Sequence, residues 1–202
     1  GRVAMALATA AQIRAATRIN AANDTLLGVL ASRADAAFAR YCGHPRPDSG
    51  GYTMEAATYT TFPGRYDIGI GKDARVAVLP TPVIQSITSV HVDPEQDYPG
   101  STLLAAGEYV KDGRKVELTS DATHAWSTSP RANKVVVSAG YTIADHDVLT
   151  QACIIQVAHW LSNTASAGSS NISTAGQSRP VAPLGLLPEV TELLYPYVIG
   201  VP

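Results

Sequence analysis

Two long apolar segments with helical spacing enclose a middle made of short strand-like segments, and this order most constrains the fold. From Asn23 to Tyr41, apolar side chains recur at steps of three and four residues, the period of a helix that packs on one face. From Asp147 to Leu161 the chain is apolar almost all round, which is typical of a helix buried on most sides. The order predicts an α+β fold in which two long and two or more short α-helices form a bundle beside a small antiparallel β-sheet.

Local signals predict where helices begin and end. Thr9 and Gln12 have the spacing of a capping box at the start of a short helix. Gly43, which is followed by prolines, predicts the end of the first long helix. Pro188 predicts the first turn of a short C-terminal helix.

The middle of the chain is rich in strand formers separated by turn residues. The sequence Lys111-Asp112-Gly113-Arg114 predicts a hairpin, because Asp-Gly suits a turn with positive φ. The segment from Val83 to Val92 predicts a strand that alternates through Ile84, Ser86, Thr88 and Val90. Further strands are predicted at Thr58–Phe62, Arg75–Leu79, Tyr109-Val110, Val116–Leu118 and Asn133–Ser138.

The C-terminal part differs in composition from the rest. We predict a core at residues 1–161, a flexible linker or arm at residues 162–183, and a helix with a docking tail at residues 184–202. Ser, Ala, Gly and Thr dominate Ser162–Pro183, which predicts a structureless stretch that either stays mobile or orders on binding. Tyr195–Pro202 is an apolar, extended end, and it either docks on a partner or folds back on its own subunit.

The charge of the chain excludes some classes of function. The formal net charge of the 202 residues is −2, so the whole chain is no obvious nucleic-acid binder. The sequence lacks a run of about 20 apolar residues, so no membrane span is predicted. Charge is uneven, however: up to Pro47, six arginines against two aspartates give +4, which leaves −6 for the remainder. Such asymmetry can steer association between copies of one chain.

The candidate motifs for catalysis or cofactor binding each lack a required element or spacing. The stretch Gly69–Ala74 imitates a G-x-G-x-x-A phosphate loop, but the residues after it read as a strand instead of the required helix. The five histidines lack the spacing of metal ligands, so we expect no metal and no cofactor. The sequence Asp145-His146-Asp147 reads as a helix cap. Cys42 and Cys153 are interpreted as free, buried thiols.

Six short motifs follow one another in an order that resembles the head-tail connector (adaptor, or head completion) proteins of tailed bacteriophages. The resemblance covers about Leu7 to Val198. Its motifs are Asn23–Leu27, Tyr41–His44, Leu79–Val90, Ala139–Tyr141, His159-Trp160 and Leu187–Tyr197. The chain departs from the family in a longer Ser162–Pro183 stretch and in expanded regions at Tyr52–Asp73 and Asp93–Gly107.

The resemblance implies a virion protein of the phage neck, assembled in the host cytoplasm, whose copies form a ring, usually of twelve. Its implied partners are further copies, the portal protein, a downstream neck or tail protein, and double-stranded DNA that passes without sequence-specific binding. We expect the tail to dock on the portal through Tyr195, Tyr197, Val198, Ile199 and Val201. We expect subunit contacts at Arg14, Arg18, Ile155, His159 and Trp160.

Two other classes stay open. One is another neck or tail completion protein, such as a tail terminator or stopper, although these usually lack two long helices around such a strand. The other is a small enzyme that uses the Asp145-His146-Asp147 cluster.

Overall fold

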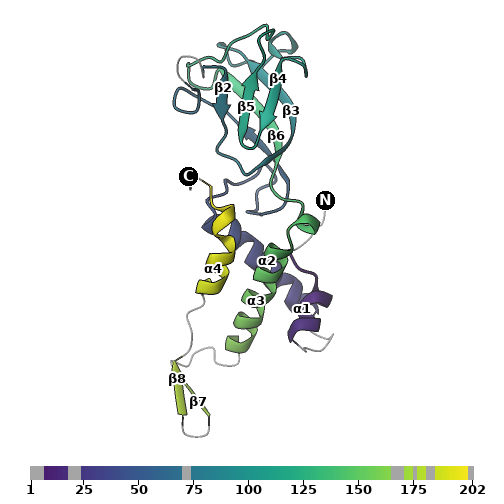
Figure 1. Cartoon of the computed structure of the whole chain (residues 1–202), viewed down its shortest axis with the longest axis vertical. Coiled ribbons are helices and arrows are strands. Elements are labelled where there is room, and N and C mark those ends of the chain that lie inside the picture. Colours follow the sequence, from purple (N-terminus) through teal and green to yellow (C-terminus); the bar gives the residue numbers. More distant parts are fainter. Residues whose placement is uncertain are drawn as a thin grey trace. The chain divides into compact units, whose positions relative to one another are not determined.

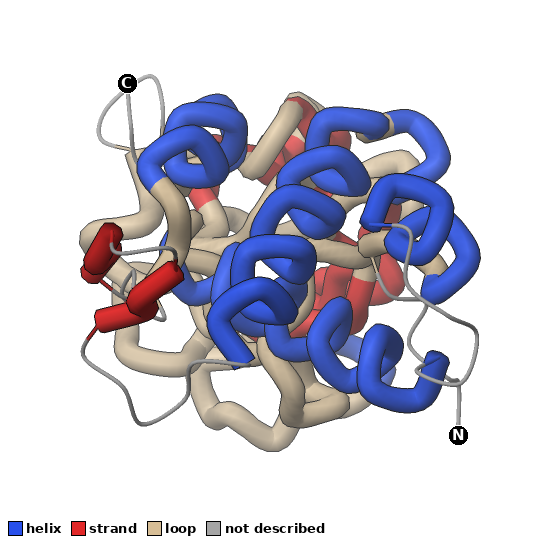
Figure 2. The backbone as a smooth tube through the Cα atoms, turned by 90° about the horizontal axis from the view of Figure 1, so that it is seen from below, coloured by secondary structure: helices blue, strands red, loops and turns tan. Residues whose placement is uncertain are grey.

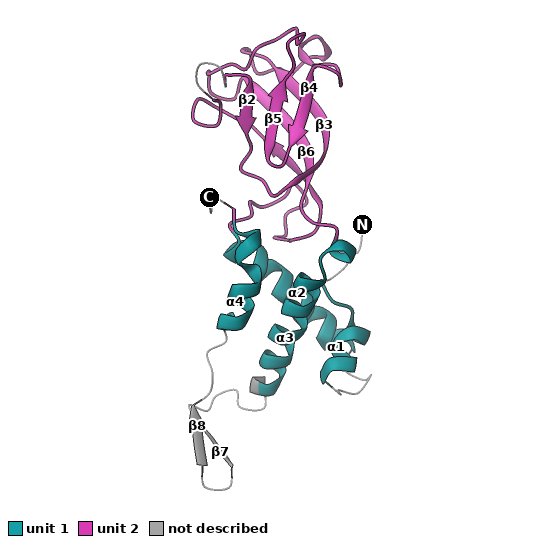
Figure 3. Cartoon of the chain, in the orientation of Figure 1, with its two compact units in different colours: residues 1–42, 143–198 teal, residues 43–142, 199–202 magenta. Residues whose placement is uncertain are grey.

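The chain folds into two compact units, each described below by itself (Figure 3). The computed structural model describes residues 7–17, 24–69, 74–164, 171–174, 177–180 and 185–199. Gly1–Cys42 and Ile143–Val198 form what we call the helical unit, and Gly43–Thr142 with Ile199–Pro202 form the sheet unit. The sheet unit is therefore inserted between the two long helices of the sequence.

The helical unit is a bundle in which one long helix packs against the others (Figures 1 and 2). Its helices are α1 (Ala10–Thr17), α2 (Asp24–Tyr41), α3 (Asp147–Thr164) and α4 (Pro188–Leu194), with the 3₁₀ turns η4 (Ile143–Asp145) and η5 (Tyr195–Tyr197). The central helix α3 packs against α1, α2 and α4. The buried side chains of this unit include Leu7, Ile13, Leu27, Phe38, Leu149 and Leu194.

The predicted signals at the helix ends are confirmed. The Thr9 N–H donates to Gln12 Oε1 at 2.8 Å, and the Gln12 N–H donates to Thr9 Oγ1 at 3.2 Å, so the capping box is reciprocal. Gly43, two residues after the end of α2 at Tyr41, has a φ of +75°. This left-handed conformation ends the helix at little cost only for glycine.

The sheet unit contains two three-stranded antiparallel sheets in place of the single small sheet that was predicted. One has the order β1-β6-β3 and the other β2-β5-β4. Pro80 and Pro82 lie between β2 and β3, where the chain passes from one sheet to the other; a proline lacks the N–H that a continuing ladder needs. The strands are β1 (Ala57–Thr61), β2 (Val76–Val78), β3 (Ile84–Val92), β4 (Tyr109–Asp112), β5 (Lys115–Leu118) and β6 (Asn133–Ala139), with the 3₁₀ turn η3 (Gly100–Thr102).

The predicted alternation along β3 is wrong. Its pairing with β6 shifts register between Ile84 and Ser86 and again between Ile87 and Ser89. Each shift changes which face of the sheet the following side chains occupy. As a result Ile84 and Val90 are buried, whereas Ser86, predicted on the same face, is exposed.

Two turns of the sheet unit depend on glycine. The predicted hairpin joins β4 to β5, with Gly113 at a φ of +56°. Gly140 has a φ of +128°, and a Cβ there would lie 2.7 Å from the Cα of Ala56 and closer still to the carbonyl of Glu55. The backbone of Gly140 therefore passes too near its neighbour for any side chain.

The stretch Ser162–Pro183 contains more structure than was predicted. Helix α3 continues to Thr164, and the strands β7 (Asn171–Thr174) and β8 (Gln177–Pro180) pair antiparallel. Isoleucine and threonine are enriched in strands, which agrees with the extended backbone of β7. Residues 165–170, 175–176 and 181–184 lie outside the described residues.

Candidate assembly surfaces

A buried amide on α3 fixes the point where α4 begins. Gln156 is fully buried, and its side chain bonds to backbone on both sides of residue 186. Its Nε2 donates to the carbonyl of Gly185 at 3.1 Å, and its Oε1 accepts the N–H of Leu187 at 3.0 Å. Both polar ends of the amide are thus used, and the chain enters α4 at a defined place. From the sequence, Gln156 was expected to pair with His159 three residues later, but its described side-chain bonds go to Gly185 and Leu187.

The predicted tail begins as a continuation of α4 instead of an extended strand. Tyr195–Tyr197 forms the turn η5, because Pro196 occupies a first-turn position where it needs no N–H partner. The Tyr197 hydroxyl lies 3.3 Å from His146 Nδ1, within the helical unit. Tyr195 stays 59% exposed, whereas Val198 and Ile199 are half-buried and Val201 lies outside the described residues.

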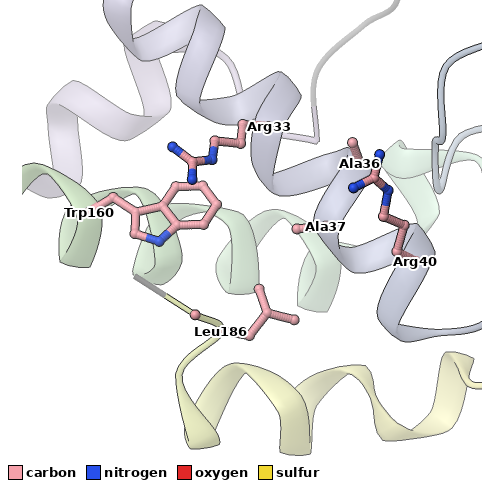
Figure 4. Close-up of a pocket in the computed structure, with 7 residues that line it drawn as sticks. Arg33, Ala36, Ala37, Arg40, Trp160 and Leu186 are labelled. Carbon is pink, nitrogen blue, oxygen red and sulfur yellow. The ribbon is translucent and has the colours of Figure 1, made fainter. Parts of the chain in front are cut away.

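A groove of about 420 Å³ runs along α2 in the helical unit (Figure 4). The Arg33 guanidinium lies 5.0 Å from the centre of the Trp160 ring, an arrangement that stabilises the cation over the aromatic face. Arg40 lines the same groove about two helical turns further along α2, so two cations border the groove. The remaining lining residues are Ala36, Ala37, Gly185 and Leu186.

The predicted subunit-contact residues are only partly gathered at this groove. Trp160, 4% exposed, lies at the groove, and Ile155 and His159 are half-buried on the same helix. Arg14 instead forms an ion pair with Asp24, with 3.1 Å between Nε and Oδ1, at the start of α2. Arg18 lies outside the described residues.

The sheet unit contains a cluster of aromatic and basic side chains that contact one another. The Arg131 guanidinium lies 4.1 Å from the centre of the Phe62 ring, and the Lys134 ammonium lies 4.9 Å from that of Tyr98. His91 meets the Tyr98 ring edge-on at 6.1 Å. Burial lowers the pKa of His91 and the nearby Lys134 lowers it further, against a smaller raising effect of Asp93, so the neutral imidazole is favoured. Arginine and aromatic residues dominate the energy of many protein contacts, so the cluster is a second candidate surface.

Two residues of this cluster, together with Gln96, are the three non-glycine residues of the described chain that have positive φ. They are Gln96, Tyr98 and Arg131, with φ values of 66°, 51° and 57°. The Tyr98 hydroxyl donates to the carbonyl of Arg131, which ties two of these residues together. The carboxylate of Asp93, 4% exposed, accepts three backbone N–H groups, those of Glu95, Asp97 and Tyr98. Such conformations persist only where neighbouring contacts hold them, and they concentrate at functional sites.

The structure shows the surroundings of the features that were considered for catalysis. His146 stacks edge-on against Tyr197, with 5.7 Å between the ring centres. The stretch Gly69–Ala74, which resembles a phosphate loop in sequence, is followed by strand β2. Its residues 70–73 lie outside the described part of the chain. Among described residues, no three His, Cys, Asp or Glu side chains come together as metal ligands. None of the helices that the structure describes has the length and apolar character of a membrane span.

Solved structures with the same fold come from gene transfer agent particles. No family model and no curated protein matches the chain. The neck of an empty particle computed with C6 symmetry matches with a TM-score of 0.56 at 17% identity, covering 93% of this chain and 87% of that chain. The neck of a native particle computed with C12 symmetry gives 0.52 at 16%, covering 93% and 86%. The virion of a native particle gives 0.55 at 17%, covering 93% and 87%. The predicted α+β class is confirmed, and at such low identity the likeness shows the fold alone.

Proposed function

We propose that this chain is a structural protein of the neck of a phage-like particle. Its copies form a ring that joins the portal of the head to the tail or to the next neck protein. The observation that carries the proposal is the fold shared over 93% of the chain with neck structures computed with C6 and C12 symmetry. The six connector motifs, which occur in the family's order, support the same role. In this role the protein is an adaptor of the virion and not an enzyme.

A ring that surrounds DNA makes two physical demands on its subunit. It needs contact surfaces for its neighbours, and Leu26 and Val29 on α2 expose apolar area that can serve this purpose. Its inner wall must not hold phosphates tightly, and a net charge of −2 is compatible with double-stranded DNA sliding past. We place subunit contacts at Arg14, Arg18, Ile155, His159 and Trp160.

The C-terminal tail is the part that we propose to bind the portal. Tyr195 follows a helix that Gln156 holds in place, and an exposed aromatic ring on a rigid support loses little entropy on binding. Tyr197, Val198, Ile199 and Val201 extend this surface to the end of the chain. The arm at residues 162–183 is proposed to reach a neighbouring copy or another neck protein.

The test is binding to the portal protein of the same particle, measured by native mass spectrometry and by titration. We expect a complex with several copies of this chain per portal ring. Tyr195→Ala should weaken the binding at least about tenfold, since buried aromatic residues dominate many interfaces. Tyr66→Ala, which removes a tyrosine that is 97% exposed in the sheet unit, is the matched control.

The outcomes separate the two claims. No complex with wild-type chain would overturn the neck assignment. A complex that Tyr195→Ala leaves as strong as Tyr66→Ala would overturn only the docking role of the tail.

A further inference from the structure

Helix α2 carries a second stripe of side chains besides the one that packs into the bundle. Leu26, Val29, Arg33, Ala36 and Arg40 follow one another at steps of three and four residues, so they line one face of the helix. Leu26 is 45% exposed and Val29 is 60% exposed. The stripe is therefore apolar towards the start of α2 and basic towards its end.

The basic half of this stripe forms one wall of the groove on the helical unit. Arg33 is held over Trp160, so its position is defined before any partner arrives. Arg40 borders the same groove, which is otherwise lined by small or apolar residues. Two arginines beside an apolar floor suit a ligand that combines carboxylates with apolar side chains.

Helix α4 has the complementary character. Its sequence contains Glu189 and Glu192 and no basic residue. These two carboxylates are exposed and lie three residues apart, on one face of the helix. Val190 and Leu194 are fully buried, so they hold α4 to its own subunit and leave the acidic face outward.

We propose that the acidic face of α4 in one copy docks on the α2 stripe of the next copy, with Glu189 and Glu192 directed at Arg33 and Arg40. This inference rests on the proposed ring. A ring needs two different surfaces on each copy, because a contact between identical patches closes a pair and goes no further. The charge pairs set orientation and register, while Leu26 and Val29 supply apolar area at the same contact.

The test uses charge reversal in two separate proteins. Arg33→Glu reverses a charge on the α2 stripe and leaves α4 unchanged. Glu192→Arg reverses a charge on the acidic face of α4 and leaves α2 unchanged. Each variant alone should self-associate at least about tenfold more weakly than wild type in sedimentation experiments at low salt. A one-to-one mixture should recover to within about threefold, because every contact then pairs either two native faces or two reversed ones.

Matched controls exclude trivial effects of charge and folding. Arg46→Glu removes another arginine that lies over an aromatic ring, 5.3 Å from the centre of Tyr52, and it should associate like wild type. If Arg33→Glu misfolds by circular dichroism, Arg40→Glu takes its place in the same mixture.

The inference is overturned if the mixture stays as weak as the single variants, if these match Arg46→Glu, or if wild-type chain does not self-associate at high concentration. In each case, binding to the portal can still support the neck assignment. Recovery in the mixture without portal binding would support this contact and count against the neck assignment.

Discussion

Removing the side-chain amide of Gln156 tests how the start of α4 is held on α3. Gln156→Ala deletes a side chain that is fully buried and that bonds to Gly185 and Leu187. The substitution keeps a good helix former in α3, so the change acts on the start of α4 and not on α3 itself. Gln151→Ala, at an exposed position of the same helix, is the matched control.

The two lost hydrogen bonds differ in cost. Gly185 is exposed, so water can replace the amide at its carbonyl, and that loss should cost at most about 1 kcal/mol. The N–H of Leu187 is less accessible, and leaving it without an acceptor costs about 1–3 kcal/mol. The total of about 1–4 kcal/mol should lower the Tm by roughly 2–16 °C for a chain of this length.

Urea unfolding and hydrogen exchange measure the two consequences. The free energy of unfolding of the helical unit should fall by the stated amount, and the amides of α4 should exchange faster in Gln156→Ala than in Gln151→Ala. Equal stability of the two variants, to within about 0.5 kcal/mol, would refute the claim that Gln156 fixes α4.

Three further changes test other parts of the chain. Gly140→Ala should cost about 3 kcal/mol or more, because its Cβ would meet the backbone at Glu55; calorimetry checks this, and a loss below 1 kcal/mol would contradict the close approach. Ile155→Asp should give a folded subunit that no longer assembles, since its half-buried position becomes enclosed in the ring; normal assembly by native mass spectrometry would refute that placement. Burial raises the pKa of both Cys42 and Cys153 to about 12, so a thiol reagent at pH 8 should react only after unfolding.

Features set by neighbouring residues were predictable from the sequence. The capping box of Thr9 and Gln12 and the turn at Gly113 use contacts within a few residues, and both are confirmed. Helix α2 begins within one residue of the predicted Asn23, and α3 begins at the predicted Asp147. Spacing and local turn chemistry were enough for these elements.

Features that depend on partners far along the chain were not predictable. The bulges of β3 arise from its pairing with β6, about 50 residues later, so the alternation of β3 alone could not reveal them. Gln156 finds its partners about 30 residues away, across a segment rich in Ser, Ala, Gly and Thr. The aromatic and basic cluster joins Phe62, Tyr98 and Arg131 from separate loops, and no periodic signal links such positions.

The insertion of the sheet unit between α2 and α3 sets an order of events during synthesis. About 100 residues separate Cys42 from Ile143, so at about 5–20 residues per second α2 waits about 5–20 s for α3 to leave the ribosome. During this delay α2 lacks α3, against which it packs, whereas strands β1 to β6 of the sheet unit have all been made and can pair. The groove that includes Trp160 and Leu186 forms only after both α3 and the segment before α4 have been made. A nascent chain therefore cannot present the complete groove to another copy until α3 and Leu186 have both left the ribosome.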